Sequence, residues 1–252
     1  MNNYSKIYTS DTLKNNAVVT VVTMPLEESV MFPVSQAIDL MKQGENVLFF
    51  TFNHDSIKIN EFMQKFLANE DNPENIKGNI GIIDAYQIPE GVDWIGFVED
   101  TIADVKGQMD LNYVFFDVLP FVENHPIRPA DDELVISTLT LLAFTRGVTT
   151  ILIKTANVPV ITAVQNKEEA QEIMEKEITI EDISKSRKVL EQSDLVLGVQ
   201  REKITWWKKV INFLLFWRKR NNFTVRVLKN RNGNRDSYKM NLDMDNFKSE
   251  IL

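Results

Sequence analysis

The sequence predicts an α/β domain with a mostly parallel, twisted sheet flanked by helices. Short β-branched and apolar runs alternate with amphipathic helical patterns along most of the chain, which is typical of parallel strands joined by crossover helices. The 252 residues are 44% hydrophobic and 25% charged, as expected for a soluble globular protein. No internal repeat or low-complexity linker interrupts the alternation, so we expect a single domain over residues 1–252.

Each predicted element follows from a local pattern. Short runs rich in β-branched and aromatic residues predict strands, at Ala17–Thr23, Asn46–Phe52, Asn79–Asp84, Tyr113–Val118, Thr149–Lys154, Asp194–Gln200 and Phe223–Lys229. Apolar residues at helical spacing predict helices, at Val30–Lys42, Ile57–Leu67, Val92–Val105 and Asp131–Phe144. Gly44 marks the end of the first helix, and Asn232-Gly233 predicts a hairpin turn within Phe223–Leu252. The acidic residues 166–182 are expected on a solvated loop with some helix.

The charge is distributed unevenly. The net charge is −8, yet residues 201–235 hold eleven Lys/Arg and one acid, a net +10, so the other residues carry −18. Any binding to nucleic acid or anionic lipid should therefore use this basic part. The chain has no cysteine and two histidines, which excludes disulfides and a histidine-rich metal site, and we expect no metal. The first residues, MNNYSKIYTSD, lack a secretory signal pattern, so a cytoplasmic location is expected.

Four stretches together resemble one family. NVLFFTFNHDS is similar to a strand and its following motif in replicative helicases of the DnaB type, and LNYVFFDVLPFV to their Walker B strand, which ends at Asp117. TLLAFTRGVTTILIKTA fits the helix and strand before their sensor glutamine. LEQSDLVLGVQR and the later TVRVLKNRNG resemble their last strands and basic K-x-R-x-G hairpin. The resemblance covers about residues 17 to 244 and implies a RecA-like P-loop NTPase fold.

The resemblance also indicates that the phosphate loop is degenerate. With Pro25 aligned to the family's loop proline, Glu28 falls at the glycine, Ser29 at the lysine and Val30 at the magnesium-binding hydroxyl. A P-loop needs its glycines, lysine and hydroxyl to hold the phosphates and magnesium. A carboxylate about 4 Å from a phosphate oxygen costs roughly 4 kcal/mol at an effective dielectric of 20, or about three decades in affinity. ATP and magnesium binding are therefore not expected, although Ser29 could serve as a weak magnesium ligand one residue out of register.

The other positions that act within one subunit are mostly replaced. Asn53 stands where the family has its catalytic glutamate, and an amide cannot take a proton. The sensor glutamine falls near Thr155. Asp117 alone matches, and without the other motif residues it is more simply a polar residue at a strand end. We predict a catalytically inactive chain; the alternative is an active enzyme with rearranged chemistry that uses Asp117, His54 and Lys154.

Lys229 and Arg231 match the family's basic pair, which projects into the neighbouring subunit's ATP site. If the resemblance extends to this role, the chain could complete a partner's site. The alternative is a charged hairpin tip that favours solubility.

Two features bear on nucleic acid. The segments that correspond to the family's DNA-binding loops are VENHPIRPADDE and ANVPVITAVQNKEEAQEIMEKEITIED, and the second holds many more acids than bases, which argues against translocation along DNA. Residues 201–222 form a basic aromatic insertion that contains Trp206, Trp207 and Trp217. It could pack on the chain's own core, dock on a protein partner or another copy, lie on a membrane surface, or bind nucleic acid.

Two functions remain open. The first is a catalytically inactive DnaB-like helicase paralogue, a non-hydrolysing subunit or regulator in a DNA replication or recombination assembly. The second is a structural or scaffold protein that reuses the RecA-like core for oligomerisation or surface attachment through residues 201–222. Both imply a protein partner or self-oligomer, weak or indirect contact with nucleic acid, and an origin suited to a phage or mobile element.

Overall fold

The structure of the chain is a computed structural model. It describes residues 16–23, 28–52, 56–69, 74, 76–85, 92–117, 132–155, 177–183, 187–201, 220–231, 237–243 and 248–251.

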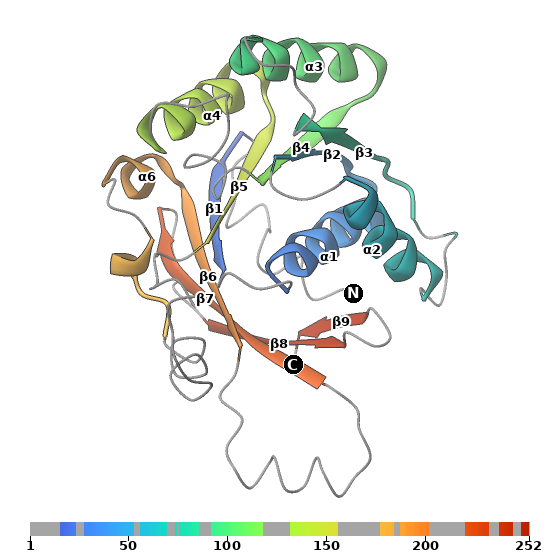
Figure 1. The fold of residues 1–252 in the computed structure, drawn as a ribbon, viewed down its shortest axis with the longest axis vertical. Coiled ribbons are helices and arrows are strands. Elements are labelled where there is room, and N and C mark those ends of the chain that lie inside the picture. The colour runs from blue at the N-terminus through green and yellow to red at the C-terminus, as the bar shows by residue number, and fades with distance from the viewer. Residues whose placement is uncertain are drawn as a thin grey trace, which may run out of the picture.

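The described strands form one sheet in the order β3-β2-β4-β5-β1-β6-β7-β8-β9 (Figure 1). Their bounds are β1 Val18–Thr23, β2 Asn46–Thr51, β3 Ile80–Asp84, β4 Leu111–Asp117, β5 Thr149–Thr155, β6 Leu195–Arg201, β7 Arg220–Asn230, β8 Ser237–Asp243 and β9 Lys248–Ile251. The strands from β3 to β6 pair in parallel, whereas β7, β8 and β9 extend the sheet with antiparallel pairings. The prediction of a mostly parallel sheet flanked by helices is confirmed.

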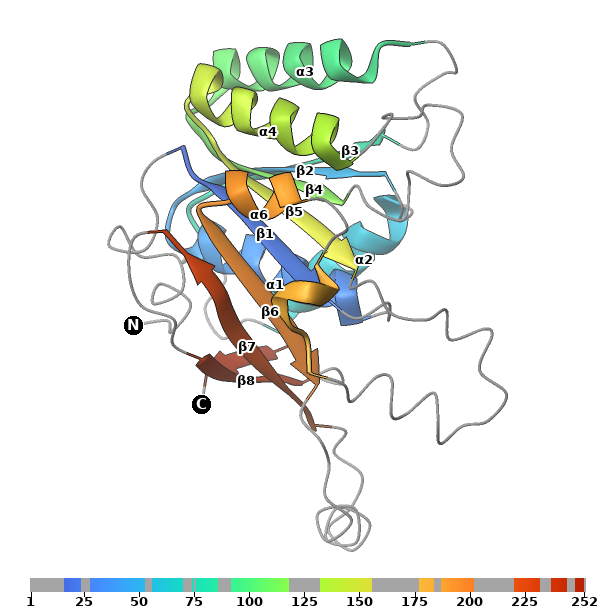
Figure 2. The same cartoon turned by 90° about the vertical axis from the view of Figure 1, so that its left-hand side faces the viewer.

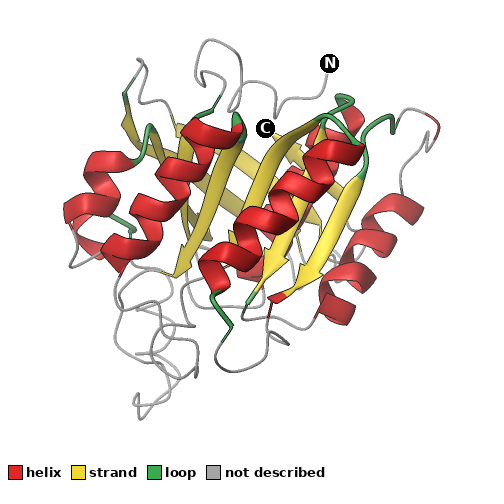
Figure 3. Ribbon diagram, turned by 90° about the horizontal axis from the view of Figure 1, so that it is seen from above, coloured by secondary structure: helices red, strands yellow, loops and turns green. Residues whose placement is uncertain are grey.

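Helices cover both faces of the parallel strands (Figures 2 and 3). One face carries α1 (Glu28–Lys42) and α2 (Ser56–Ala68); the other carries α3 (Trp94–Gln108), α4 (Asp132–Arg146), the short 3-10 helix η5 (Ile180–Asp182) and α6 (Arg187–Gln192). Gly44 ends the turn after α1 with a φ of 92°, which glycine adopts without steric cost. The predicted glycine stop is therefore seen in the backbone.

Alternate side chains of each central strand enter two separate cores. Phe49 of β2 stacks on Phe115 of β4 at 5.5 Å between ring centroids, in the core beneath α1 and α2. Phe50 stacks on Phe116 at 5.2 Å, in the core beneath α3 and α4. Since the side chains of a strand alternate between faces, a strand buried on both sides reads as a continuous apolar run. This is why the strands could be predicted from short runs alone.

The predicted elements are all present, with ends that differ by at most three residues. The hairpin of β7 and β8 is confirmed, and its turn residues lie outside the described ranges. The short α6 and the last strand β9 were not predicted. Within the described part of the chain, no helix has both the length and the apolar character needed to cross a membrane.

The prediction of a solvated acidic loop is wrong for residues 177–182. Ile178 and Asp182 are buried. Asp182 Oδ2 accepts hydrogen bonds from the Thr179 amide (2.9 Å) and hydroxyl (2.8 Å), which offsets the cost of burying its charge. Ile178 packs above Gly198 of β6, where an added Cβ would lie 3.3 Å from the isoleucine side chain. The acids of this segment hid an apolar residue that the sheet needs.

Candidate functional site

The carboxyl ends of the parallel strands form the edge at which open α/β sheets bind ligands. At this edge β1 ends at Thr23, β4 at Asp117 and β5 at Thr155. Thr23 pairs in register with Thr155, and Asp117 pairs with Ile153, two residues earlier on the same strand. The fold therefore brings Asp117, the backbone of Thr155 and the end of β1 to one edge.

The connection from β1 to α1 is short. Only residues 24–27 separate Thr23 from Glu28, the first residue of α1, and Pro25 lies in this stretch outside the described residues. Glu28 and Ser29 occupy the first two positions of the helix backbone; their side chains are not among those described. Val30 is 6% exposed and belongs to the core beneath α1 and α2, so the position aligned with the family's hydroxyl holds a packed apolar side chain.

Asp117 is a buried carboxyl at the end of β4. It lies on the same strand face as Phe115, toward α1 and α2, and is 7% exposed. Its register neighbour on β2 is Thr51, which is fully buried. Burial raises the pKa of Asp117 to about 7 because the charged form loses hydration. At neutral pH this carboxyl is therefore protonated about half of the time.

The sequence did not single out a second carboxyl at this edge. Asp84 ends β3 in register with Thr51, which places it one strand beyond Asp117, on the same face. Ser56, the first residue of α2, donates a hydrogen bond to Asp84 Oδ2 at 2.8 Å. An acid that ends a predicted strand was a signal available in the sequence. The serine contact gives Asp84 a role in holding the start of α2.

Several predicted positions lie outside what the structure describes. Asn53 and His54 fall between β2 and α2, and the side chains of Lys154 and Thr155 are not among those described. Trp206, Trp207 and Trp217 lie between the end of β6 at Arg201 and the start of β7 at Arg220, and the two predicted DNA-binding segments lie mostly outside as well.

Lys229 and Arg231 lie at the opposite edge of the sheet, where β7 ends beside the start of β6. Lys229 Nζ donates to the carbonyl oxygens of Leu190, Ser193 (2.7 Å) and Glu191 (3.3 Å), at and just after the end of α6. An ammonium group has three N–H donors, so these three acceptors satisfy all of them. A cation at a helix C-terminus is also favoured by the helix dipole.

The surroundings of the two basic residues differ. Burial lowers the pKa of Lys229, and the charge of Arg231 lowers it further. Arg231 is half exposed; it pairs with Asp194 Oδ1 at 2.8 Å and donates to the Glu191 carbonyl at 2.6 Å. Both side chains therefore have contacts within the chain, and Arg231 keeps exposed donors. A role for the pair in a neighbouring subunit remains a prediction.

No three or more His, Asp or Glu side chains among the described residues are grouped as metal ligands. The carboxyl edge therefore offers one buried acid, Asp117, a second acid held by Ser56, and an acidic turn in place of a glycine-rich loop.

The sheet order and the two helix layers define a RecA-like fold, and solved structures share it. One is the ATPase domain of a DnaB-like helicase, which superposes with a TM-score of 0.68 at 13% identity and covers 95% of this chain and 86% of its own. Another is a DnaB-like replicative helicase solved to show its interactions with primase. It has a TM-score of 0.64 at 11% identity, and the match covers 94% of this chain and 57% of that one.

These identities show likeness of fold. No protein-family model matches the sequence, and no curated protein matches it. The resemblance to DnaB-type motor domains is therefore confirmed in the fold of nearly the whole chain.

Proposed function

We propose that this chain is a non-hydrolysing DnaB-like subunit or regulator that acts in the cytoplasm through contacts with other protein chains in a DNA replication or recombination assembly. The observation that carries the proposal is the junction of β1 and α1. Four residues connect the two elements, and the stretch from Pro25 to Ser29 contains two glutamates and neither glycine nor lysine.

ATP and magnesium do not fit this junction. A Walker A loop surrounds phosphates with backbone N–H groups that glycines expose, and its lysine neutralises them. Here an acid is the first residue of α1, where negative charge already complements the helix dipole. A carboxylate about 4 Å from a phosphate would cost roughly 4 kcal/mol. The buried Val30 offers no hydroxyl at the magnesium position.

Asp117 supports the same conclusion independently. A Walker B acid acts through its negative charge on magnesium, and hard cations prefer ionised oxygen ligands. The pKa of Asp117 is about 7, so a cation would first have to displace a proton from about half of the molecules at neutral pH. The second family acid is replaced by Asn53. The proposal therefore includes no catalytic step within this subunit.

The fold supports the assembly part of the proposal. One of the similar structures is a DnaB-like helicase described with its interactions with primase, so this fold is used elsewhere in a multiprotein replication complex. The acidic body argues against direct movement along DNA, since phosphate contacts supply most non-specific affinity. We infer that protein contacts, rather than nucleotide or DNA, are the basis of its activity.

Titration calorimetry with ATP and excess magnesium tests the inactive site. We expect no binding at micromolar concentrations and no phosphate release. Tight, magnesium-dependent binding contradicts the proposal. Turnover that disappears in Asp117→Ala would instead establish an enzyme with rearranged chemistry.

Light scattering tests the assembly role. A monomer that associates only when mixed with an active DnaB-like ATPase supports the paralogue. A stable homo-oligomer that is dispersed by Trp207→Glu and Trp217→Glu favours the scaffold function.

A further inference from the structure

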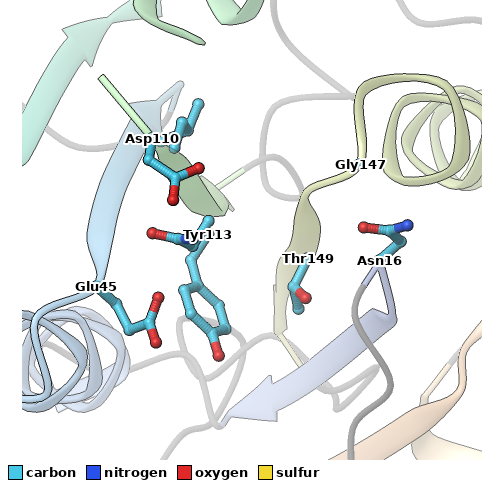
Figure 4. Close-up of a pocket in the computed structure, with 8 residues that line it drawn as sticks. Asn16, Glu45, Asp110, Tyr113, Gly147 and Thr149 are labelled. Carbon is cyan, nitrogen blue, oxygen red and sulfur yellow. The ribbon is translucent and has the colours of Figure 1, made fainter.

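A polar cavity of about 380 Å³ opens at the amino-terminal edge of the sheet (Figure 4). Its walls come from the starts of β4 and β5 and from the residues just before β1 and β2. The polar lining residues are Asn16, Glu45, Asp110, Asn112, Tyr113 and Thr149. The volume lies within the range of small-molecule sites. Asp117 and the β1–α1 turn lie at the other edge, so this cavity is separate from the degenerate nucleotide site.

Thr149 indicates that the cavity is suited to a ligand. It is 6% exposed, and its hydroxyl faces the cavity that it lines (Figure 4). Among the described residues this hydroxyl has no hydrogen-bond partner. Tyr113 is the register partner of Thr149 on the neighbouring strand, so the two side chains lie side by side on one sheet face. Buried polar groups are generally hydrogen-bonded, and a ligand would satisfy this one.

The cavity has a negative potential. The carboxylates of Glu45 and Asp110 both line it. Partial burial raises the pKa of Glu45, and the charge of Asp110 raises it further; burial and then Glu45 likewise raise the pKa of Tyr113. The nearby ammonium of Lys106 donates to the carbonyl oxygens of Arg146 and Gly147 at the end of α4. A cation in the cavity would relieve the repulsion between the two acids.

The donor set selects the kind of cation. Among the described residues, no third acid or histidine joins Glu45 and Asp110 as a metal ligand would, and Ca²⁺ or Mg²⁺ needs six or more oxygen ligands. The lining instead offers dispersed acceptors: two carboxylates on one side, and the Asn16 amide and Thr149 hydroxyl on the other (Figure 4). A guanidinium group has five N–H donors in a planar fork, which suits several separated acceptors.

We propose that this cavity binds a guanidinium group, with Glu45 and Asp110 as its charge partners and Thr149 as an uncharged acceptor. The group could come from a free guanidino compound or from an arginine side chain of another protein chain, including a second copy of this one. The proposal does not depend on the proposed function, because its residues and its test involve neither nucleotide nor Asp117.

A titration with N-acetyl-arginine amide, followed by amide chemical shifts in NMR spectra, tests the recognition. We expect saturable shifts centred on residues 110–113 and 149. The isosteric but uncharged N-acetyl-citrulline amide should bind at least about tenfold more weakly, because charge-assisted hydrogen bonds contribute more than neutral ones.

Glu45→Gln and Asp110→Asn should each weaken the binding by at least about tenfold. Asp110 is exposed, so its variant should fold even if the Glu45 variant does not. Glu61→Gln, at an exposed position on α2, is the matched control and should bind like the parent. Absence of saturable shifts, equal binding of the citrulline compound, or parent-like affinity in both acid variants would overturn the proposal.

Sedimentation velocity then identifies the source of the group. Self-association that is reversed by N-acetyl-arginine amide and by Asp110→Asn assigns the cavity to an arginine of a second copy. A protein that binds the amide but stays monomeric assigns it to a free guanidino compound or another chain. Both results support guanidinium recognition.

Discussion

Replacing Asp117 with asparagine should stabilise the protein, and more so as the pH rises. The asparagine side chain would keep the size of the aspartate but could not ionise. In the parent, burial raises the pKa of Asp117 from 3.8 to about 7, so the native state holds a proton that the unfolded state releases between these values. The native state then binds more protons than the unfolded state, and the free energy of unfolding falls as the pH rises.

The size of the effect follows from the two pKa values. Each pH unit between 3.8 and about 7 is worth about 1.4 kcal/mol, which gives roughly 4 kcal/mol above pH 7. The same linkage leaves a penalty of about 2 kcal/mol at pH 5 and almost none below about pH 3. The variant should therefore gain about 2 kcal/mol relative to the parent between pH 5 and pH 8.

Urea unfolding of both proteins at several pH values, followed by tryptophan fluorescence, measures this difference. Asp100→Asn, an exposed acid on α3, is the control and should not change the slope with pH. A variant that is less stable than the parent at pH 8, or a difference that does not change with pH, would refute the reasoning. Such a result would mean that the negative charge of Asp117 is stabilised in the native state, as a cation-binding acid requires.

Two further substitutions test contacts in the fold. Lys229→Met should lower the free energy of unfolding by about 2 kcal/mol, because three carbonyl oxygens at the end of α6 lose a charged donor; in thermal unfolding this is a drop of roughly 4–8 °C, whereas Lys77→Met, outside these contacts, should change little. An unchanged midpoint for Lys229→Met would show that the three contacts do not stabilise α6. Gly78→Ala should destabilise more strongly, by several kcal/mol, because its Cβ would lie 1.9 Å from the Glu45 carbonyl oxygen, and parent-like stability would exclude this close approach.

The sequence predicted the fold well because its central strands are buried on both faces. Such strands appear as continuous apolar runs, and the helices between them show a clear apolar periodicity. The exceptions have local reasons. The helix α6 has only six residues, β9 has four, and the segment around Ile178 is dominated by acids, so none of them shows a strong pattern of its own.

The candidate sites were predictable to different degrees. Asp117 could be found because it ends an apolar strand in a resembling motif. The contacts of Lys229 could not, because they depend on α6, about 40 residues earlier in the chain. The cavity at the amino edge was also invisible: Glu45, Asp110 and Thr149 belong to three separate connections that only the parallel pairing of β2, β4 and β5 brings together.

By itself the sequence determined the α/β class, the order of its elements and the chemistry missing from the β1–α1 turn, since local patterns and residue types are properties of short segments. The tertiary structure decided which polar groups are buried and which lie together, because burial and proximity depend on how distant segments pack. It placed Asp117 in a dry environment, directed Lys229 to α6, and gathered two acids and a threonine around a cavity. These arrangements come from the parallel sheet, whose register fixes neighbours that lie tens of residues apart in the chain.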